Sequence, residues 1–170
     1  MLISKVIHLR KVEPQDLPWL YKWENDSALW EMGDTHNPLS QKDLRDYIES
    51  STGDIYKDGQ LRLIIEDLQQ QAQTLGCIDL YNFDSHNKKA AVGIYVDESA
   101  RKKEIGKSAI HLLEDYAFGF LHLKMLYAFV AETNEASKKL FLSCLWKQTA
   151  ILQEWTNNGN TLLFQRLNKG

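Results

Sequence analysis

The pattern of hydrophobic and polar positions predicts a short first strand followed by two helices. Residues 6–10 form a compact apolar run of the strand type. A helix follows over residues 14–24, opened by a proline and an aspartate and continued by apolar residues at helical spacing. A second helix is expected to start at residues 40–43, where Ser-x-x-Asp is a capping-box-like pattern, and to end near residues 50–53.

Three strands are predicted in the middle of the chain, over residues 61–66, 74–83 and 89–96. The glutamine-rich segment 67–73 is polar and suits a hairpin loop between the first two of these strands. Residues 84–88 are rich in turn-forming side chains and should connect the last two.

In the last third of the chain, segments with apolar residues at helical spacing alternate with strand-type apolar segments. Apolar residues at helical spacing predict a long helix over residues 105–120, and a β-branched and aromatic run predicts a strand over residues 125–131. Thr-Asn-Glu at residues 133–135 should cap a further helix. Two final strands, residues 148–155 and 161–167, flank the hairpin turn Asn-Asn-Gly-Asn. The predicted order β-α-α-β-β-β-α-β-α-β-β indicates one α+β domain with a mixed sheet over residues 1–170.

The stretch between the predicted strand 89–96 and the following helix holds the strongest chemical signal. Arg101, Lys102 and Lys103 precede Gly106 at the start of that helix. Unpaired N–H groups and the positive end of the dipole meet at a helix N-terminus, and three cations beside them favour a phosphate-bearing ligand. A merely solvated charged loop is the alternative interpretation.

Composition narrows the choice of partners. The chain has 170 residues and a net charge of −3, which argues against nucleic acid as the main partner and is compatible with a cationic substrate. No apolar run reaches membrane-spanning length, no signal peptide is evident, and the two cysteines suit a reducing compartment, so we expect a cytoplasmic protein without a membrane partner. The five histidines lack ligand spacing, so no metal is expected.

Three segments together resemble the GNAT (GCN5-related N-acetyltransferase) family, closest to its ribosomal-protein alanine and spermidine/diamine N-acetyltransferases. The first is LRKVEPQDLPWLYKWEND at residues 9–26. The second is Arg-Lys-Lys-Glu-Ile-Gly at residues 101–106, which is similar to the family pattern Q/R-x-x-G-x-G/A, with Glu104 where the family has its middle glycine. The third is residues 134–141, similar to N-x-x-S-x-x-L-F/Y.

The resemblance implies a sheet that is splayed between its fourth and fifth strands and a cleft that binds acetyl-CoA as co-substrate. Backbone N–H groups of the loop would hold the pyrophosphate, and the fourth strand and the last helix would flank the pantetheine arm. The residues implied to bind the co-substrate are Ile94, Tyr95, Val96, Arg101, Lys102, Lys103, Glu104, Ile105, Gly106, Lys107, Ser108, Asn134 and Ser137. Many relatives have a proton-donating tyrosine where this chain has Phe141.

Six side chains are candidates for the acceptor side. Asp79 lies between apolar residues of a predicted strand, at a position where polyamine acetyltransferases carry an acid, and could bind or deprotonate an amine; a solvated strand residue is the alternative. Glu132 could act as a base through water, although an exposed acid near a helix cap is the simpler interpretation. The remaining substrate-binding candidates, an acid and three aromatics that could surround a cation, are Glu24, Trp23, Trp30 and Tyr81.

The sequence therefore predicts an acetyl-CoA-dependent N-acetyltransferase that acts on a primary amine. The amine could belong to a polyamine or diamine or to a protein N-terminus, and the protein could form homo-oligomers. Two alternatives remain at this point: a GNAT-fold CoA-binding sensor or interaction domain that has lost catalysis, which Phe141 and Glu104 motivate, and a nucleotide-binding module that uses the same loop.

Overall fold

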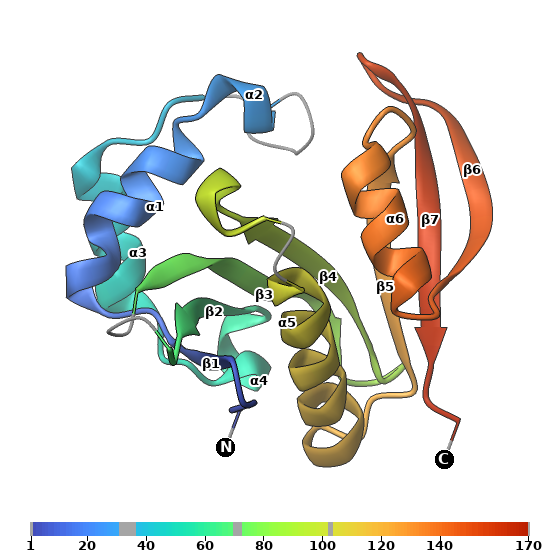
Figure 1. Cartoon of the computed structure of the whole chain (residues 1–170), viewed down its shortest axis with the longest axis horizontal. Coiled ribbons are helices and arrows are strands. Elements are labelled where there is room, and N and C mark those ends of the chain that lie inside the picture. Colours follow the sequence, from blue (N-terminus) through green and yellow to red (C-terminus); the bar gives the residue numbers. More distant parts are fainter. Residues whose placement is uncertain (1, 31–36, 70–72, 102–103, 170) are drawn as a thin grey trace.

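A seven-stranded mixed sheet organises the chain (Figure 1). The computed structural model describes residues 2–30, 37–69, 73–101 and 104–169. The strands are β1 (Ile7–Lys11), β2 (Leu61–Asp67), β3 (Thr74–Asp84), β4 (Lys89–Val96), β5 (Met125–Ala131), β6 (Lys147–Thr156) and β7 (Gly159–Leu167), in the sheet order β1-β2-β3-β4-β5-β7-β6. The helices are η1 (Pro14–Asp16), α1 (Leu17–Glu24), α2 (Ser27–Trp30), α3 (Gln41–Ser50), α4 (Ile55–Asp58), η2 (Glu98–Ala100), α5 (Ile105–Glu114), η3 (Asp115–Phe120) and α6 (Glu135–Ser143).

The predicted element order is confirmed, and the strands β4 and β5 have the predicted bounds. The short helices α2 and α4 were not predicted, because four residues are too few to show a helical period. The predicted helix 105–120 is corrected: its last six residues, Asp115–Phe120, form a π-helix, in which the Leu121 N–H donates to the Tyr116 carbonyl at 3.0 Å. Residues 70–72 of the predicted glutamine-rich loop lie outside the described residues.

Helices cover both faces of the sheet. The face under α5 and α6 carries the larger core, in which side chains such as Ile78, Leu113 and Phe164 are fully buried. The opposite face of β2 and β3 is covered by α1 and α3, through Leu20, Leu44 and their neighbours. Alternate residues of one strand therefore enter different environments, which matters below for the side chains of β2, β3 and β4.

The two middle strands of the sheet separate part-way along their length. The parallel strands β4 and β5 pair at three positions, Lys89 with Met125, Ala90 with Leu126 and Ala91 with Tyr127. Beyond Ala91, β4 stays paired with β3 while β5 stays paired with β7, so a gap opens between an N-terminal arm (β1–β4) and a C-terminal arm (β5–β7). Figure 1 shows the gap between β4 and α6, with the start of α5 beside it. The implied splay is confirmed.

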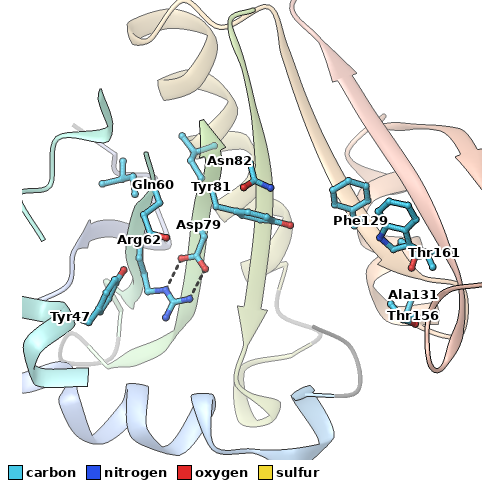
Figure 2. A pocket seen from close by; sticks show the side chains of 13 residues that line it. Tyr47, Gln60, Arg62, Asp79, Tyr81, Asn82, Phe129, Ala131, Thr156 and Thr161 are labelled. Atoms are coloured by element: carbon cyan, nitrogen blue, oxygen red, sulfur yellow. Dashed lines mark hydrogen bonds and ion pairs between the residues drawn. The ribbon is translucent and has the colours of Figure 1, made fainter. Parts of the chain in front are cut away.

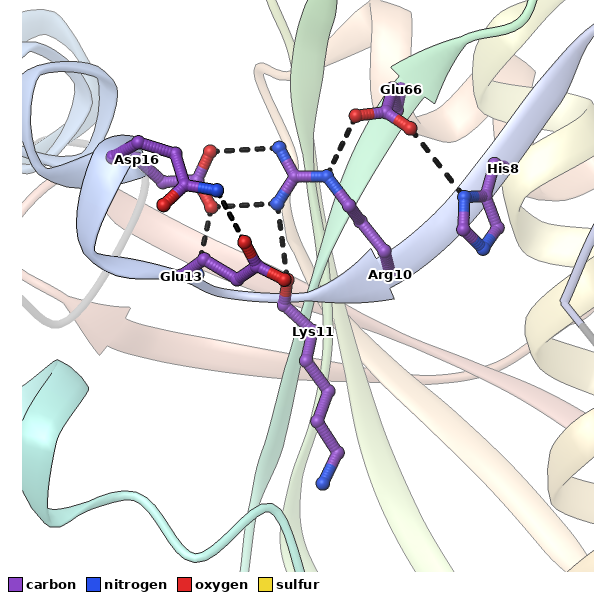
Figure 3. A network of polar contacts seen from close by, with 7 residues as sticks. His8, Arg10, Lys11, Glu13, Asp16 and Glu66 are labelled. Carbon is purple, nitrogen blue, oxygen red and sulfur yellow. Dashed lines mark hydrogen bonds and ion pairs between the residues drawn. The ribbon is translucent and has the colours of Figure 1, made fainter. Parts of the chain in front are cut away.

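Buried polar contacts fasten the first helical segment to the sheet far from this gap (Figure 3). Arg10 on β1 donates to both oxygens of Asp16, at 2.7 and 2.9 Å, and to Glu66 on β2 at 2.8 Å. Asp16 is only 2% exposed and also accepts from the Glu13 N–H at 2.8 Å, which begins η1. The bonds to Asp16 raise the pKa of the Arg10 guanidinium above its ordinary value, so the arginine stays charged.

Candidate active site

The N-terminus of α5 lies on one side of the gap and has the geometry of an anion site. The first intrahelical bond of α5 runs from the Ser108 N–H to the Glu104 carbonyl at 2.9 Å, so the N–H groups of residues 105–107 precede the helical bonding pattern. Glu104 is the N-cap, and its side chain makes no capping bond to these groups. Its backbone is left-handed, with φ of 56°, a conformation that glycine adopts more easily. Glu104 thus adopts a backbone conformation that is typical of glycine.

Gly106 allows α5 and α6 to approach each other. A Cβ atom at this position would lie 3.1 Å from Cδ2 of Leu140 on α6, which is tighter than ordinary packing. The close approach places the first turn of α5 against the side chain of Leu140 in α6. Lys107 and Ser108, also implied as co-substrate residues, lie half-buried in the same turn. The N–H groups and the close backbone approach together fit a diphosphate.

The loop that leads into α5 is tied to α1 by an ion pair. Lys22 Nζ lies 2.9 Å from Oδ2 of Asp97, which follows β4 directly and also caps η2 through Ser99. The hydrogen bond from Lys22 is the largest cause that lowers the pKa of Asp97, to about 2. Arg101 is exposed and donates to the Val96 carbonyl at 3.1 Å. The implied residues Lys102 and Lys103 lie outside the described residues.

The residues implied to flank the pantetheine arm have side chains on different faces of the sheet. Ile94 and Val96 pack toward the core under α5, whereas the ring of Tyr95 lies on the opposite face, 5.3 Å from Trp23. On α6, Asn134 is the N-cap and accepts from the Ser137 N–H at 3.0 Å, so these two residues order the helix start.

Phe141 is buried in the core of the C-terminal arm. It is 3% exposed and packs on Trp146 and Phe164, with ring centroids 4.8 and 5.9 Å away. Having no hydroxyl group, the side chain cannot donate a proton.

A cavity of about 630 Å³ opens between the arms on the face opposite α5 (Figure 2). The side chains of β2 and β3 form one wall with Tyr47 from α3, and the other wall comes from β5, β6 and β7. The lining residues are Tyr47, Gln60, Leu61, Arg62, Asp79, Leu80, Tyr81, Asn82, Phe129, Ala131, Trp155, Thr156 and Thr161. Co-substrate and acceptor could therefore reach the gap from opposite faces of the sheet.

Arg62 is the charged centre of the β2–β3 wall. Its Nε and Nη2 donate to the two oxygens of Asp79, both at 2.9 Å, and its Nη1 donates to Glu24 at the end of α1. The guanidinium carbon lies 5.9 Å from the ring centre of Tyr47. Burial lowers the pKa of Arg62, but the charge of Asp79 and its other partners raise it more, so the net pKa lies well above the ordinary value. The arginine therefore stays charged.

The structure brings some of the predicted acceptor residues into the cavity and leaves others out. Asp79 and Tyr81 line it. Trp23 does not: it is 4% exposed between Trp19 and Tyr95, so its expected place in an aromatic wall around a cation is corrected, because its ring completes the core under α1. Trp30 is likewise outside the lining, and its indole N–H donates to the Glu24 carbonyl at 2.6 Å.

The two remaining acids also lie outside the lining. Glu24 reaches the cavity only through Arg62, to which it is bonded. Glu132 accepts from the amide of Asn160 at 2.9 Å, beside the β6–β7 hairpin. Of the three carboxylates singled out from the sequence, Asp79 is thus the one in the cavity wall.

Four lining residues with side chains suited to binding a ligand, Arg62, Tyr47, Phe129 and Trp155, were not predicted from the sequence. Arg62 did give a signal, since it is a lone cation inside the apolar strand Leu61–Asp67. Tyr47, Phe129 and Trp155 gave none, because each sits at an aromatic position that suits a core equally well. Their common face becomes visible only when strands far apart in sequence lie side by side.

Within the described residues, no group of three or more His, Cys, Asp or Glu side chains could hold a metal ion. None of the helices among these residues combines the length and the apolar character needed to cross a membrane.

A mixed sheet that splits between two parallel strands, with a helix N-terminus at the split, defines the acetyltransferase class that the sequence resembles. The family described as "Acetyltransferase (GNAT) domain" matches residues 7–144, and the chain belongs to this family. No curated protein matches the sequence.

Solved structures with the same fold include two kinds of N-acetyltransferase. One is a spermidine N-acetyltransferase from Vibrio cholerae in complex with CoA and spermine, with a TM-score of 0.84, 21% identity and 96% coverage of both chains. Another is RimL, a ribosomal L7/L12 alpha-N-protein acetyltransferase in complex with coenzyme A, with a TM-score of 0.83, 17% identity and coverage of 97% of this chain and 96% of that one. At these identities the likeness shows the shared fold.

A dodecameric structure of spermidine N-acetyltransferase from Vibrio cholerae is also similar. It has a TM-score of 0.80 and 21% identity, and the alignment covers 96% of this chain and 95% of that one.

Proposed function

We propose that the whole chain acts as one acetyltransferase domain that moves an acetyl group from acetyl-CoA to a primary amine. The observation that carries this proposal is the separation of β4 and β5 beyond Ala91, with an anion-binding helix start on one face and a cavity on the other. Acetyl-CoA supplies an acetyl group activated as a thioester. The neutral amine nitrogen forms a bond to the carbonyl carbon, the carbon–sulfur bond breaks, and the proton that the nitrogen loses passes through water to the thiolate.

The residues divide between two tasks in this proposal. The N–H groups at the start of α5 hold the diphosphate, with Arg101 and Lys107 adding positive charge. Backbone N–H groups of β4 beyond Ala91 lie at the edge of the gap and polarise the carbonyl. Asp79 takes the proton of the ammonium group; each carboxylate oxygen has a second lone pair, so it can accept this bond while it is bonded to Arg62.

The proposal extends to the setting in which the enzyme works. The similar dodecameric enzyme supports assembly into homo-oligomers. Both cysteines are free and buried, and burial raises the pKa of the Cys77 thiol to about 12, which suits a structural thiol in a reducing cytoplasm.

A thiol-release assay tests the function directly. The purified chain is incubated with acetyl-CoA and, separately, with spermidine, putrescine, peptides with free N-termini and simple monoamines. We expect amine-dependent release of free CoA together with an acetylated product in the mass spectrum. Binding of acetyl-CoA in a thermal-shift assay without transfer to any amine would instead indicate the non-catalytic CoA-binding alternative.

A further inference from the structure

The C-terminal arm presents an aromatic wall to the cavity. Phe129 on β5 and Trp155 on β6 have nearly parallel rings, with an interplanar angle of 17° and centroids 6.4 Å apart. Both rings keep much of their surface uncovered, 38% for Phe129 and 60% for Trp155. Figure 2 shows Tyr81 extending toward this wall from β3. An apolar planar group placed here would remove ring surface from water, which is favourable.

The cavity is poor in negative charge. Among its 13 lining residues, all within the described chain, only Arg62 and Asp79 are charged, and their charges cancel. A polyamine carries two or more ammonium groups at neutral pH. One of them could meet Asp79, but among the described residues the lining offers no carboxylate to the next.

The groups best suited to an ammonium ion are already used inside the protein. Two carboxylates and one aromatic ring surround the guanidinium of Arg62, which is the composition a cation site requires. A second ammonium group would have to separate Arg62 from Glu24 and leave a largely buried arginine without one of its partners, which is unfavourable. The arginine therefore occupies the place where a second amine could bind.

We propose that the acceptor is a primary monoamine with an aromatic carbon skeleton. Its ring lies against Phe129 and Trp155, and its single amino group is directed across the cavity toward Asp79 at the gap. The inference rests on the proposed function and names the substrate class of that same site. Arg62 acts as the specificity-determining residue that excludes polyamines.

The first experiment compares acceptors. Initial rates with acetyl-CoA are measured for 2-phenylethylamine, tryptamine, hexylamine, putrescine, spermidine and a peptide with a free N-terminus. We expect kcat/KM for the two aromatic monoamines to exceed that for spermidine by about tenfold or more, because the loss of one aromatic contact changes an affinity by about this factor. A higher kcat/KM for spermidine, putrescine or the peptide would overturn the inference while leaving the proposed function intact.

The second experiment removes the aromatic wall. Trp155→Ala should raise KM for tryptamine about tenfold and change kcat little, and Trp155→Phe should restore most of the affinity. Trp155 is largely exposed, so the fold should survive the change. Phe120→Ala is the matched control, because Phe120 is 72% exposed on η3 and lies outside the cavity lining. An unchanged KM in Trp155→Ala would contradict the inference.

The third experiment frees the two carboxylates. Arg62→Gln should lower the ratio of kcat/KM for tryptamine to that for spermidine by about tenfold, because Asp79 and Glu24 become available to ammonium groups. Arg10→Gln is the control, since Arg10 makes the same kind of contacts away from the cavity and should leave the ratio unchanged. An unchanged ratio in a folded Arg62→Gln variant, or an equal shift in both variants, would contradict the inference.

A binding measurement separates failure of the inference from failure of the proposed function. Calorimetry with the CoA-loaded protein should detect tryptamine binding that Trp155→Ala weakens. Transfer to polyamines without binding of aromatic amines would overturn only the inference. Binding of tryptamine without transfer to any amine would overturn the proposed function and support the ligand class.

Discussion

Arg10 and Arg62 lie on neighbouring strands, and each is held between two carboxylates. Arg10 contacts Asp16 and Glu66, and Arg62 contacts Asp79 and Glu24, in both cases with two bonds to one acid and one to the other. The first network fastens η1 to the sheet (Figure 3), whereas the second forms a wall of the cavity (Figure 2). The same three-residue composition therefore anchors a helical segment in one place and lines a cavity in the other. The two networks differ in their position, because the Arg62 network borders the cavity between the arms and the Arg10 network lies away from it.

The two networks should differ most in their effect on catalysis when one acid of each network is replaced by its uncharged amide. Asp79→Asn should lower kcat/KM about 100-fold, because the proposed general base is lost. Glu66→Gln is the matched change in the other network and should leave catalysis close to that of the parent. Steady-state rates across pH check this, with acetyl-CoA binding as the control for folding. Equal losses in both variants would show that the networks share a structural role.

The pair of Lys22 and Asp97 extends the comparison to a network with one acid. Folding lowers the pKa of Asp97 from 3.8 to about 2, so the pair stabilises the fold above pH 3.8, and this contribution disappears as the pH falls toward 2. Asp97→Asn should therefore lower Tm by about 3 °C at pH 6, with a difference that vanishes near pH 2. Scanning calorimetry of both proteins checks this. A difference that stays constant from pH 6 to pH 2 would contradict the role of the charge.

Glu104 is an acid placed beside the proposed diphosphate site, and changing it should have the smallest effect. Glu104→Gly removes a negative charge and relieves a left-handed backbone at φ of 56°. We expect acetyl-CoA to bind about threefold more tightly, with a small rise in Tm. Isothermal titration checks the affinity. Weaker binding would mean that the loop holds its ligand differently from its relatives.

Local sequence patterns predicted the scaffold well and the cavity only in part. The bounds of β4 and β5 and the start of α5 follow from periodicity and from a glycine at a helix start, which act over a few residues. Asp79 was noticed because an acid inside an apolar strand is unusual. Its partner Arg62 lies 17 residues away and pairs with it only through the β2–β3 register, which no local pattern encodes.

Aromatic residues were the least predictable part of the site. Trp23 and Trp155 look alike in the sequence, yet one is 4% exposed in the core and the other is 60% exposed in the cavity. The difference arises because Trp23 lies on the side of α1 that packs against the sheet, whereas Trp155 sits on the edge strand β6. Only the assembled sheet distinguishes a core ring from one that faces the cavity.

Within the sheet, the two arms are joined by three pairs of residues, which connect Lys89–Ala91 of β4 with Met125–Tyr127 of β5. The loop that leads into α5 belongs to the N-terminal arm, and the aromatic wall belongs to the C-terminal arm. Substitutions in the β6–β7 hairpin should therefore reshape the C-terminal wall of the cavity with little effect on the loop that leads into α5. Under the proposed function, such a division lets the acceptor change while the donor stays the same.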